Sequence, residues 1–179
     1  MRQKYLGDSY DIVKRFWAES LRSIAPLYAH ARFVPSEIRV EYTSATTIPV
    51  DTFPSGPFGI FLDPHTGIPL PIESSQQVTA SHVPLSFIVE LNEVFGPRYL
   101  ICFDQSYHRR YSLTPNEQRE KKREYLRDHE LNSFYYVSHA PFLFVSREAE
   151  VLDAIRVKLS SRGVPPRRFV PAEKSGSIL

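Results

Sequence analysis

The sequence has almost no cysteine and no long apolar stretch. Its single cysteine, Cys102, excludes an internal disulfide and a zinc site built from several cysteine ligands. No window of about 18 apolar residues occurs, so a membrane-spanning helix is not expected. The opening stretch M-R-Q-K-Y-L-G-D lacks the apolar segment of a signal peptide. We therefore expect a cytoplasmic protein without a membrane partner.

Three glycine motifs that mark common enzyme classes are also absent. The sequence has no G-x-G-x-x-G for dinucleotides and no G-x-x-x-x-G-K-[ST] for nucleoside triphosphates. It has no G-x-S-x-G either, the turn that carries the serine of many hydrolases. A catalytic site in this chain would therefore be built from other residues.

The composition is that of one soluble globular domain. The 179 residues are 42% hydrophobic and 23% charged, and the formal net charge of +2 does not by itself indicate nucleic acid as a partner. No internal repeat occurs, and nothing in the composition divides the chain. We expect a single domain over residues 1–166 and a flexible C-terminal tail over 167–179. The oligomeric state is not indicated.

The pattern of apolar residues predicts alternating helices and strands. A spacing of three to four residues indicates helices at 8–24, 84–95, 114–130 and 147–162. Short alternating or continuous apolar runs indicate strands at 27–34, 38–43, 59–62, 98–103, 134–137 and 142–145. This order predicts a single three-layer, Rossmann-like α/β domain with a mainly parallel sheet and an antiparallel edge near the C-terminus.

Three acidic residues come where ligands bind in such folds. Asp63 and Asp104 directly follow predicted strands, and Asp8 follows the short segment that opens the chain. Ligands of open α/β sheets bind beyond the carboxyl ends of the strands. Converging carboxylates suit Mg²⁺ or Mn²⁺, which prefer oxygen ligands. His65, His108 and His139 also follow strand-like runs, and each is a candidate general base or ligand.

Each of these residues also has a purely structural interpretation. Asp8 is a candidate helix N-cap, together with Ser9. Asp63 begins the stretch D-P-H-T-G, a pattern typical of turns, and Asp104 can cap a loop. The lysines and arginine at 121–123 alternate with glutamates, which predicts a solvated helix with internal ion pairs.

Two resemblances to known families rest on short motifs. The stretches 63–67 (D-P-H-T-G), 104–106 (D-Q-S) and 7–14 (G-D-x-x-D-x-x-K) resemble those of a set of uncharacterised bacterial proteins. That likeness spans most of the chain but implies no particular activity. A looser likeness is to Rossmann-type methyltransferases, because Asp63-Pro64 is similar to the start of their D-P-P-Y segment. His65 and Thr66 depart from that pattern, and the glycine-rich loop that holds S-adenosylmethionine is absent.

Three functional hypotheses follow from these residues. The first is a metal-dependent phosphoesterase or nuclease that acts on a nucleic acid or nucleotide. In it the aspartates at 8, 63 and 104 hold Mg²⁺ or Mn²⁺, His65 or His139 acts as base, and Arg109 contacts phosphate. The second is a methyltransferase-like protein, active or degenerate. The third is a non-catalytic binding or assembly domain.

Overall fold

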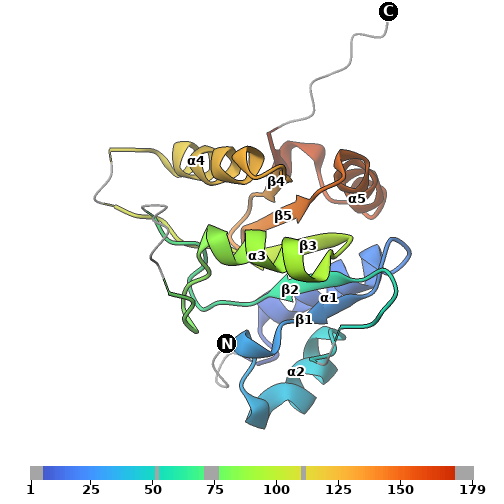
Figure 1. Cartoon of the computed structure of the whole chain (residues 1–179). Coiled ribbons are helices and arrows are strands. Elements are labelled where there is room, and N and C mark those ends of the chain that lie inside the picture. Colours follow the sequence, from blue (N-terminus) through green and yellow to red (C-terminus); the bar gives the residue numbers. More distant parts are fainter. Residues whose placement is uncertain (1–5, 51–52, 71–76, 110–111, 172–179) are drawn as a thin grey trace, which may run out of the picture.

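The computed structural model describes residues 6–50, 53–70, 77–109 and 112–171, and its centre is a six-stranded sheet (Figure 1). Across the sheet the strand order is β1-β2-β3-β5-β4-β6. The strands are β1 (Leu27–Ala29), β2 (Gly59–Leu62), β3 (Tyr99–Phe103), β4 (Asn132–Tyr136), β5 (Phe142–Ser146) and β6 (Phe169–Val170).

The sheet is mixed, with a parallel half followed by an antiparallel half. β1 pairs with β2, and β2 with β3, in parallel. β5 then lies antiparallel between β3 and β4, and β6 pairs antiparallel with the far side of β4. β4 consequently runs in the same direction as β1, β2 and β3. The prediction of an α/β domain that combines parallel strands with antiparallel strands near the C-terminus is confirmed.

Five α-helices accompany the sheet in the described ranges. They are α1 (Ser9–Leu21), α2 (Arg39–Thr46), α3 (Leu85–Phe95), α4 (Pro115–Asp128) and α5 (Ala149–Ser161). One hydrophobic core contains buried residues of α1, α2 and α5, and a second contains those of α3 and α4. Figure 1 shows α3 in front of the sheet and α1 behind it.

The two cores take alternate side chains of the same strands. Phe61 and Ile101 belong to the core with α1, whereas Ile60 and Leu100 belong to the core with α3. Successive side chains of a strand point to opposite faces of a sheet. Both faces of β2 and β3 are therefore covered, which explains why these strands appear in the sequence as continuous apolar runs.

Side-chain caps mark the start of two helices, and the predicted cap at Asp8 is confirmed. The Asp8 carboxylate accepts hydrogen bonds from the backbone N–H groups of Tyr10 and Asp11, as an N-cap of α1 does. Thr114 and Glu117 form a reciprocal capping box at the start of α4, with Pro115 as its first residue. Local side-chain chemistry thus fixes where both helices begin.

The predicted strand at 38–43 is wrong, because this segment contains a 3₁₀ turn and the start of α2. Ile38, Tyr42 and Thr46 are fully buried, whereas Val40 is 81% exposed. A spacing of four places the buried residues on one helical face. Over six residues this pattern imitates the alternation of a strand. The predicted strand at 27–34 is likewise shorter, since β1 ends at Ala29.

The predicted domain boundary at residue 166 is also wrong. Phe169 and Val170 form β6 and pair with Tyr136 and Tyr135 of β4. Phe169 is buried against the ring of Phe134, with centroids 5.4 Å apart. The sheet therefore continues beyond residue 166. Residues 172–179 of the predicted tail lie outside the described residues.

Candidate functional site

The two predicted strand-end aspartates lie at the same edge of the sheet. β2 and β3 are parallel neighbours, with Leu62 opposite Cys102. Asp63 follows β2, and Asp104 follows β3. Both carboxylates are almost completely buried, which is unusual for a charged side chain without a partner. Their partners therefore decide what they do.

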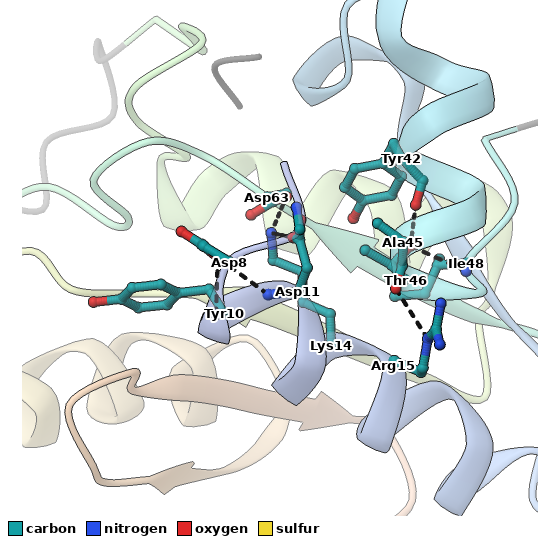
Figure 2. A network of polar contacts seen from close by, with 11 residues as sticks. Asp8, Tyr10, Asp11, Lys14, Arg15, Tyr42, Ala45, Thr46, Ile48 and Asp63 are labelled. Carbon is teal, nitrogen blue, oxygen red and sulfur yellow. Dashed lines mark hydrogen bonds and ion pairs between the residues drawn. The ribbon is translucent and has the colours of Figure 1, made fainter. Parts of the chain in front are cut away.

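Asp63 is ion-paired with a lysine of α1. Lys14 Nζ donates to Asp63 Oδ2 at 2.7 Å and to Asp11 Oδ1 at 2.8 Å. Figure 2 shows the Lys14 ammonium between these two carboxylates, with the ring of Tyr42 from α2 close by. The remaining oxygen of Asp11 accepts the backbone N–H of Gly7 at 2.7 Å. This group of contacts connects α1 to the end of β2.

The charges of this group keep Lys14 protonated. Burial lowers the pKa of Lys14, but the negative charges of Asp63 and Asp11 outweigh it and raise the pKa above its usual value. Burial, followed by the charges of Asp63 and Asp11, raises the pKa of the Tyr42 phenol. Near neutral pH, Lys14 is therefore an ammonium and Tyr42 a neutral phenol. Neither side chain is suited to act as a nucleophile or base.

Asp104 is held by a second, separate set of contacts. Its Oδ2 accepts from Lys122 Nζ and from the Tyr135 hydroxyl, both at 2.7 Å. Its Oδ1 accepts the backbone N–H of Ile68 at 2.9 Å and lies 2.6 Å from Ser106 Oγ. Oδ1 also accepts the backbone N–H of Ser106 at 3.3 Å, so Oδ2 has two donors and Oδ1 has three. Because both of its oxygens are fully hydrogen-bonded, Asp104 is a structural residue at this edge of the sheet.

The pKa of Asp104 reflects these contacts. Burial raises the pKa of this carboxyl, but the Lys122 ammonium and the hydrogen bonds from Ser106 and Ile68 outweigh it and bring the pKa below its usual value. A lowered native pKa means that ionised Asp104 contributes stability at neutral pH.

This contribution predicts a loss of stability in acid. It is present above the unfolded-state pKa of about 3.9 and is lost as the pH falls through the lower native pKa of Asp104. We expect the Asp104 side-chain carboxyl carbon, followed by NMR, to titrate with a midpoint below about 3.9 in the folded protein. A midpoint at or above that value would mean that Lys122 does not neutralise Asp104.

The two lysines approach from opposite faces of the sheet. Lys14 belongs to α1, which packs on one face, and Lys122 belongs to α4, which packs on the other. Each buried ion pair therefore joins one helical layer to the end of one central strand. The carboxyl edge of β2 and β3 is held in place from both sides.

The predicted solvated helix at 121–123 needs a correction. Arg123 does pair with Glu120, as expected. Lys122, however, is only 1% exposed and lies on the same face of α4 as buried Gln118 and Leu126. The spacing of four between these three residues is the sequence signal that could have revealed its burial.

The glycine of D-P-H-T-G allows the chain to pass close to Asp104. Gly67 has φ +127°, a conformation that side chains disfavour. A Cβ atom there would lie 2.4 Å from Asp104 Oδ1 and 2.6 Å from Asp104 Cα. This close approach lets the N–H of Ile68 reach the Asp104 carboxylate. The stretch is therefore a turn, as one of the sequence interpretations proposed, and it also completes the Asp104 network.

A pocket of about 430 Å³ opens at this edge, and we call it the edge pocket. Its lining includes three of the predicted site residues, Asp8, Asp63 and His65. Tyr10 and Phe103 form an aromatic wall, with ring centroids 5.6 Å apart and the rings nearly perpendicular. A volume of this size accommodates a small organic molecule.

The other predicted site residues lie elsewhere or at the margin. His139 packs edge-on against Tyr10, with centroids 5.7 Å apart. Asp104 is not part of the pocket lining, and Arg109 is exposed in the segment after β3. Sequence reasoning missed Tyr10 and Gln105 of the pocket lining. Their side chains meet across 95 residues of sequence, which no local pattern reveals.

The described residues offer no ready metal centre. Within residues 6–50, 53–70, 77–109 and 112–171, no group of three or more His, Cys, Asp or Glu side chains is arranged to hold a metal ion. The aspartates at 63 and 104 each form an ion pair with a lysine ammonium. The shared Mg²⁺ or Mn²⁺ site stays a prediction.

Comparison of the chain with protein-family models, with curated proteins and with solved structures gives no match. In the part of the chain that the structure describes, none of the helices has the length and apolar character needed to cross a membrane. The function must therefore be argued from the edge pocket itself.

Proposed function

We propose that this protein is a binding domain that takes a small organic cation into the edge pocket. The observation that carries this proposal is the excess of negative charge at one end of the pocket. Asp8 and Asp63 line the pocket together with Lys14, and the Lys14 ammonium is shared by the carboxylates of Asp63 and Asp11. Three negative charges and one positive charge leave a formal charge of −2.

The carboxylate of Asp8 is the one best placed for a ligand. Unlike Asp11 and Asp63, it is only partly buried, and its Oδ1 alone takes up the backbone donors of the helix start. A positively charged nitrogen group in the pocket would pair with Asp8 and lie beside the rings of Tyr10 and Phe103. Aromatic faces and carboxylates together are a common setting for organic cations.

His65 supplies a second contact for such a ligand. Its Nδ1 lies 3.4 Å from Ser81 Oγ, and its buried Nε2 has no hydrogen-bond partner among the described residues. In the tautomer that donates from Nδ1 to Ser81, Nε2 is an acceptor. A buried acceptor without a donor is unfavourable, and an N–H group of the ligand would satisfy it.

A metal-dependent phosphoesterase is the second candidate. It is favoured by one observation, namely that Asp8, Asp63 and His65 of the predicted set line the same pocket. In this reaction a Mg²⁺ or Mn²⁺ ion would activate water next to a phosphodiester of a nucleic acid or nucleotide. For this function, Asp63 would have to bind the metal ion in place of the Lys14 ammonium.

The Rossmann-like assignment and the methyltransferase-like hypothesis are also kept as proposals. They are supported by three adjacent parallel strands and by hydrophobic cores on both faces of the sheet. They are also supported by β5, which lies antiparallel between β3 and β4. S-adenosylmethionine carries a positive charge and a nucleoside. It therefore belongs in the same binding panel as simpler cations.

The test is a binding panel read by thermal shift and calorimetry. We expect benzylammonium and benzamidinium to raise the melting temperature, and benzoate, the anion of the same shape, to leave it unchanged. Asp8→Asn is expected to weaken the binding of both cations about tenfold, since it removes one charge from a partly screened pair. Asparagine caps helices as well as aspartate does, so α1 keeps its start.

The control variant is Asp128→Asn, which removes an exposed carboxylate from the end of α4 and should leave cation binding unchanged. Binding of the cations to Asp8→Asn with wild-type affinity would overturn the proposal. A shift with Mn²⁺ but with none of the organic cations would favour the phosphoesterase instead.

A further inference from the structure

Four arginines lie along β4, near the edge of the sheet that β6 forms. Arg119, Arg123 and Arg127 belong to α4, which lies beside β4 (Figure 1), and Arg168 immediately precedes β6. The three arginines of α4 recur every four residues, so they share one side of the helix. Arg168 is joined to the chain just after β4, because its Nη1 donates to the carbonyl of Val137 at 3.3 Å. We call these four arginines the arginine row.

The contacts of the row are evenly spaced along this strand. Arg123 Nε donates to the carbonyl of Ser133 at 3.1 Å. The guanidinium of Arg119 lies over the ring of Tyr135, 5.9 Å from its centre. The contact at Val137 comes two residues further along the chain. Two residues of an extended strand span about 6.6 Å, so three guanidinium groups are anchored at regular intervals.

The arginine row carries an excess of positive charge. Among the described residues, the one carboxylate within ion-pair distance of the row is that of Glu120, which pairs with Arg123 and lies 3.8 Å from Arg127. Asp153 lines a cavity together with Arg127, but its carboxylate is 3.6 Å from Arg156, which is not part of the row. Four guanidinium groups and one carboxylate leave a formal charge of +3.

The row combines accessible arginines with arginines that are already held in position. The side chain of Arg127 is 62% exposed, and Arg168 is also exposed. Arg123 is held by the contacts described above. Arg119 is partly buried, and its Nη1 donates to Asn116 Oδ1 at 2.8 Å. A side chain held in this way loses little freedom when a ligand binds.

We propose that the arginine row binds the phosphates of a single nucleic-acid strand. Four residues of a helix span about 6 Å, so the three arginines of α4 alone extend over about 12 Å. An anion that contacts the whole row must therefore be a polymer. Guanidinium groups make planar, two-pronged contacts with phosphate. A line of positive side chains that follows the backbone is how proteins bind single strands without regard to sequence.

An acidic peptide is less suited to this row than a nucleic-acid strand is. Its charges are on flexible side chains, which lose rotamer freedom on binding, whereas phosphates are part of the backbone itself. The proposal does not depend on the edge pocket, because none of the described residues that line that pocket belongs to α4 or β6.

The experiment is a fluorescence-anisotropy titration of labelled oligouridylate and oligothymidylate, each of about ten nucleotides, with the full chain. We expect saturable binding whose logarithmic affinity falls with the logarithm of salt concentration, with a slope of about −3 for four phosphate contacts. Tighter binding of one oligonucleotide would identify RNA or DNA as the partner, and equal binding would identify the shared phosphate backbone. No binding at about 50 mM salt would overturn the proposal, and so would equally tight binding of a glutamate peptide of the same charge.

The two exposed arginines of the row allow a test that leaves the core intact. Arg127→Gln and Arg168→Gln should each weaken oligonucleotide binding about three- to fivefold at low salt. The double variant should change the salt slope from about −3 to about −1.5, because two phosphate contacts are lost. Arg22→Gln, at the exposed end of α1, is the matched control and should bind as wild type does.

Circular dichroism checks that these variants keep the fold. A folded double variant with wild-type affinity and salt slope would contradict the proposal. Asp8→Asn should have no effect on oligonucleotide binding, so the arginine row and the edge pocket are tested independently.

Discussion

Replacing Lys122 by methionine is expected to destabilise the protein by about 3–5 kcal/mol, the usual effect of leaving a buried charge without its partner. The Lys122 ammonium is the only cation in hydrogen-bond contact with Asp104 among the described residues. Without it, Asp104 must either remain as a buried anion or take up a proton. Urea unfolding followed by circular dichroism measures the effect.

The neighbouring residue provides a matched control. Lys121 lies on the same helix but is exposed, so Lys121→Met should change stability by no more than about 0.5 kcal/mol. Pairing Lys122→Met with Asp104→Leu removes both charges and should recover part of the lost stability. Equal unfolding midpoints for Lys121→Met and Lys122→Met would contradict a structural role for this ion pair.

Replacing Gly67 by alanine is the second substitution with a large expected effect. The new methyl group would meet the Asp104 side chain and the Asp104 main chain at distances below any normal contact. Overpacking of this kind destabilises by about 1–3 kcal/mol, and an unfavourable positive φ adds about 1–2 kcal/mol. We expect a total loss of about 2–5 kcal/mol in the free energy of unfolding.

A second glycine separates the effect of steric overlap from the effect of the positive φ. Gly96 also has a positive φ, but a Cβ atom there would meet no atom within 4 Å. Gly96→Ala should therefore show only the backbone effect, about 1–2 kcal/mol. If the two variants lose equal stability, the close approach of Gly67 to Asp104 is not what requires glycine.

Most helices and strands could be predicted because their signals are local. The cap at Asp8 and the capping box at Thr114 fix two helix starts within a few residues. The segment that forms α2 was misread because its buried residues recur every four positions over too short a length. In so short a segment the spacing of a helix cannot be told from that of a strand. The packing of Tyr42 in the first core decides in favour of the helix.

Only part of the candidate site could be predicted from the sequence. Parallel strands end on the same side of a sheet, and this rule predicts that Asp63 and Asp104 lie at one edge of the sheet. Their lysine partners could not be predicted, since Lys14 lies 49 residues from Asp63 and reaches it only after α1 has packed on the sheet. The spacing of Lys122 with Gln118 and Leu126 could have revealed that Lys122 is buried, but not that it pairs with Asp104, 18 residues away.

The most direct test of the structural role of these aspartates is a crystal structure of the protein soaked in Mn²⁺, with anomalous data collected for manganese. Our interpretation predicts that Lys14 and Lys122 keep their contacts of 2.7 Å with Asp63 and Asp104, and that neither carboxylate carries an anomalous peak. A manganese ion bound by both aspartates, with the lysines turned away, would contradict it and would restore the metal-dependent phosphoesterase.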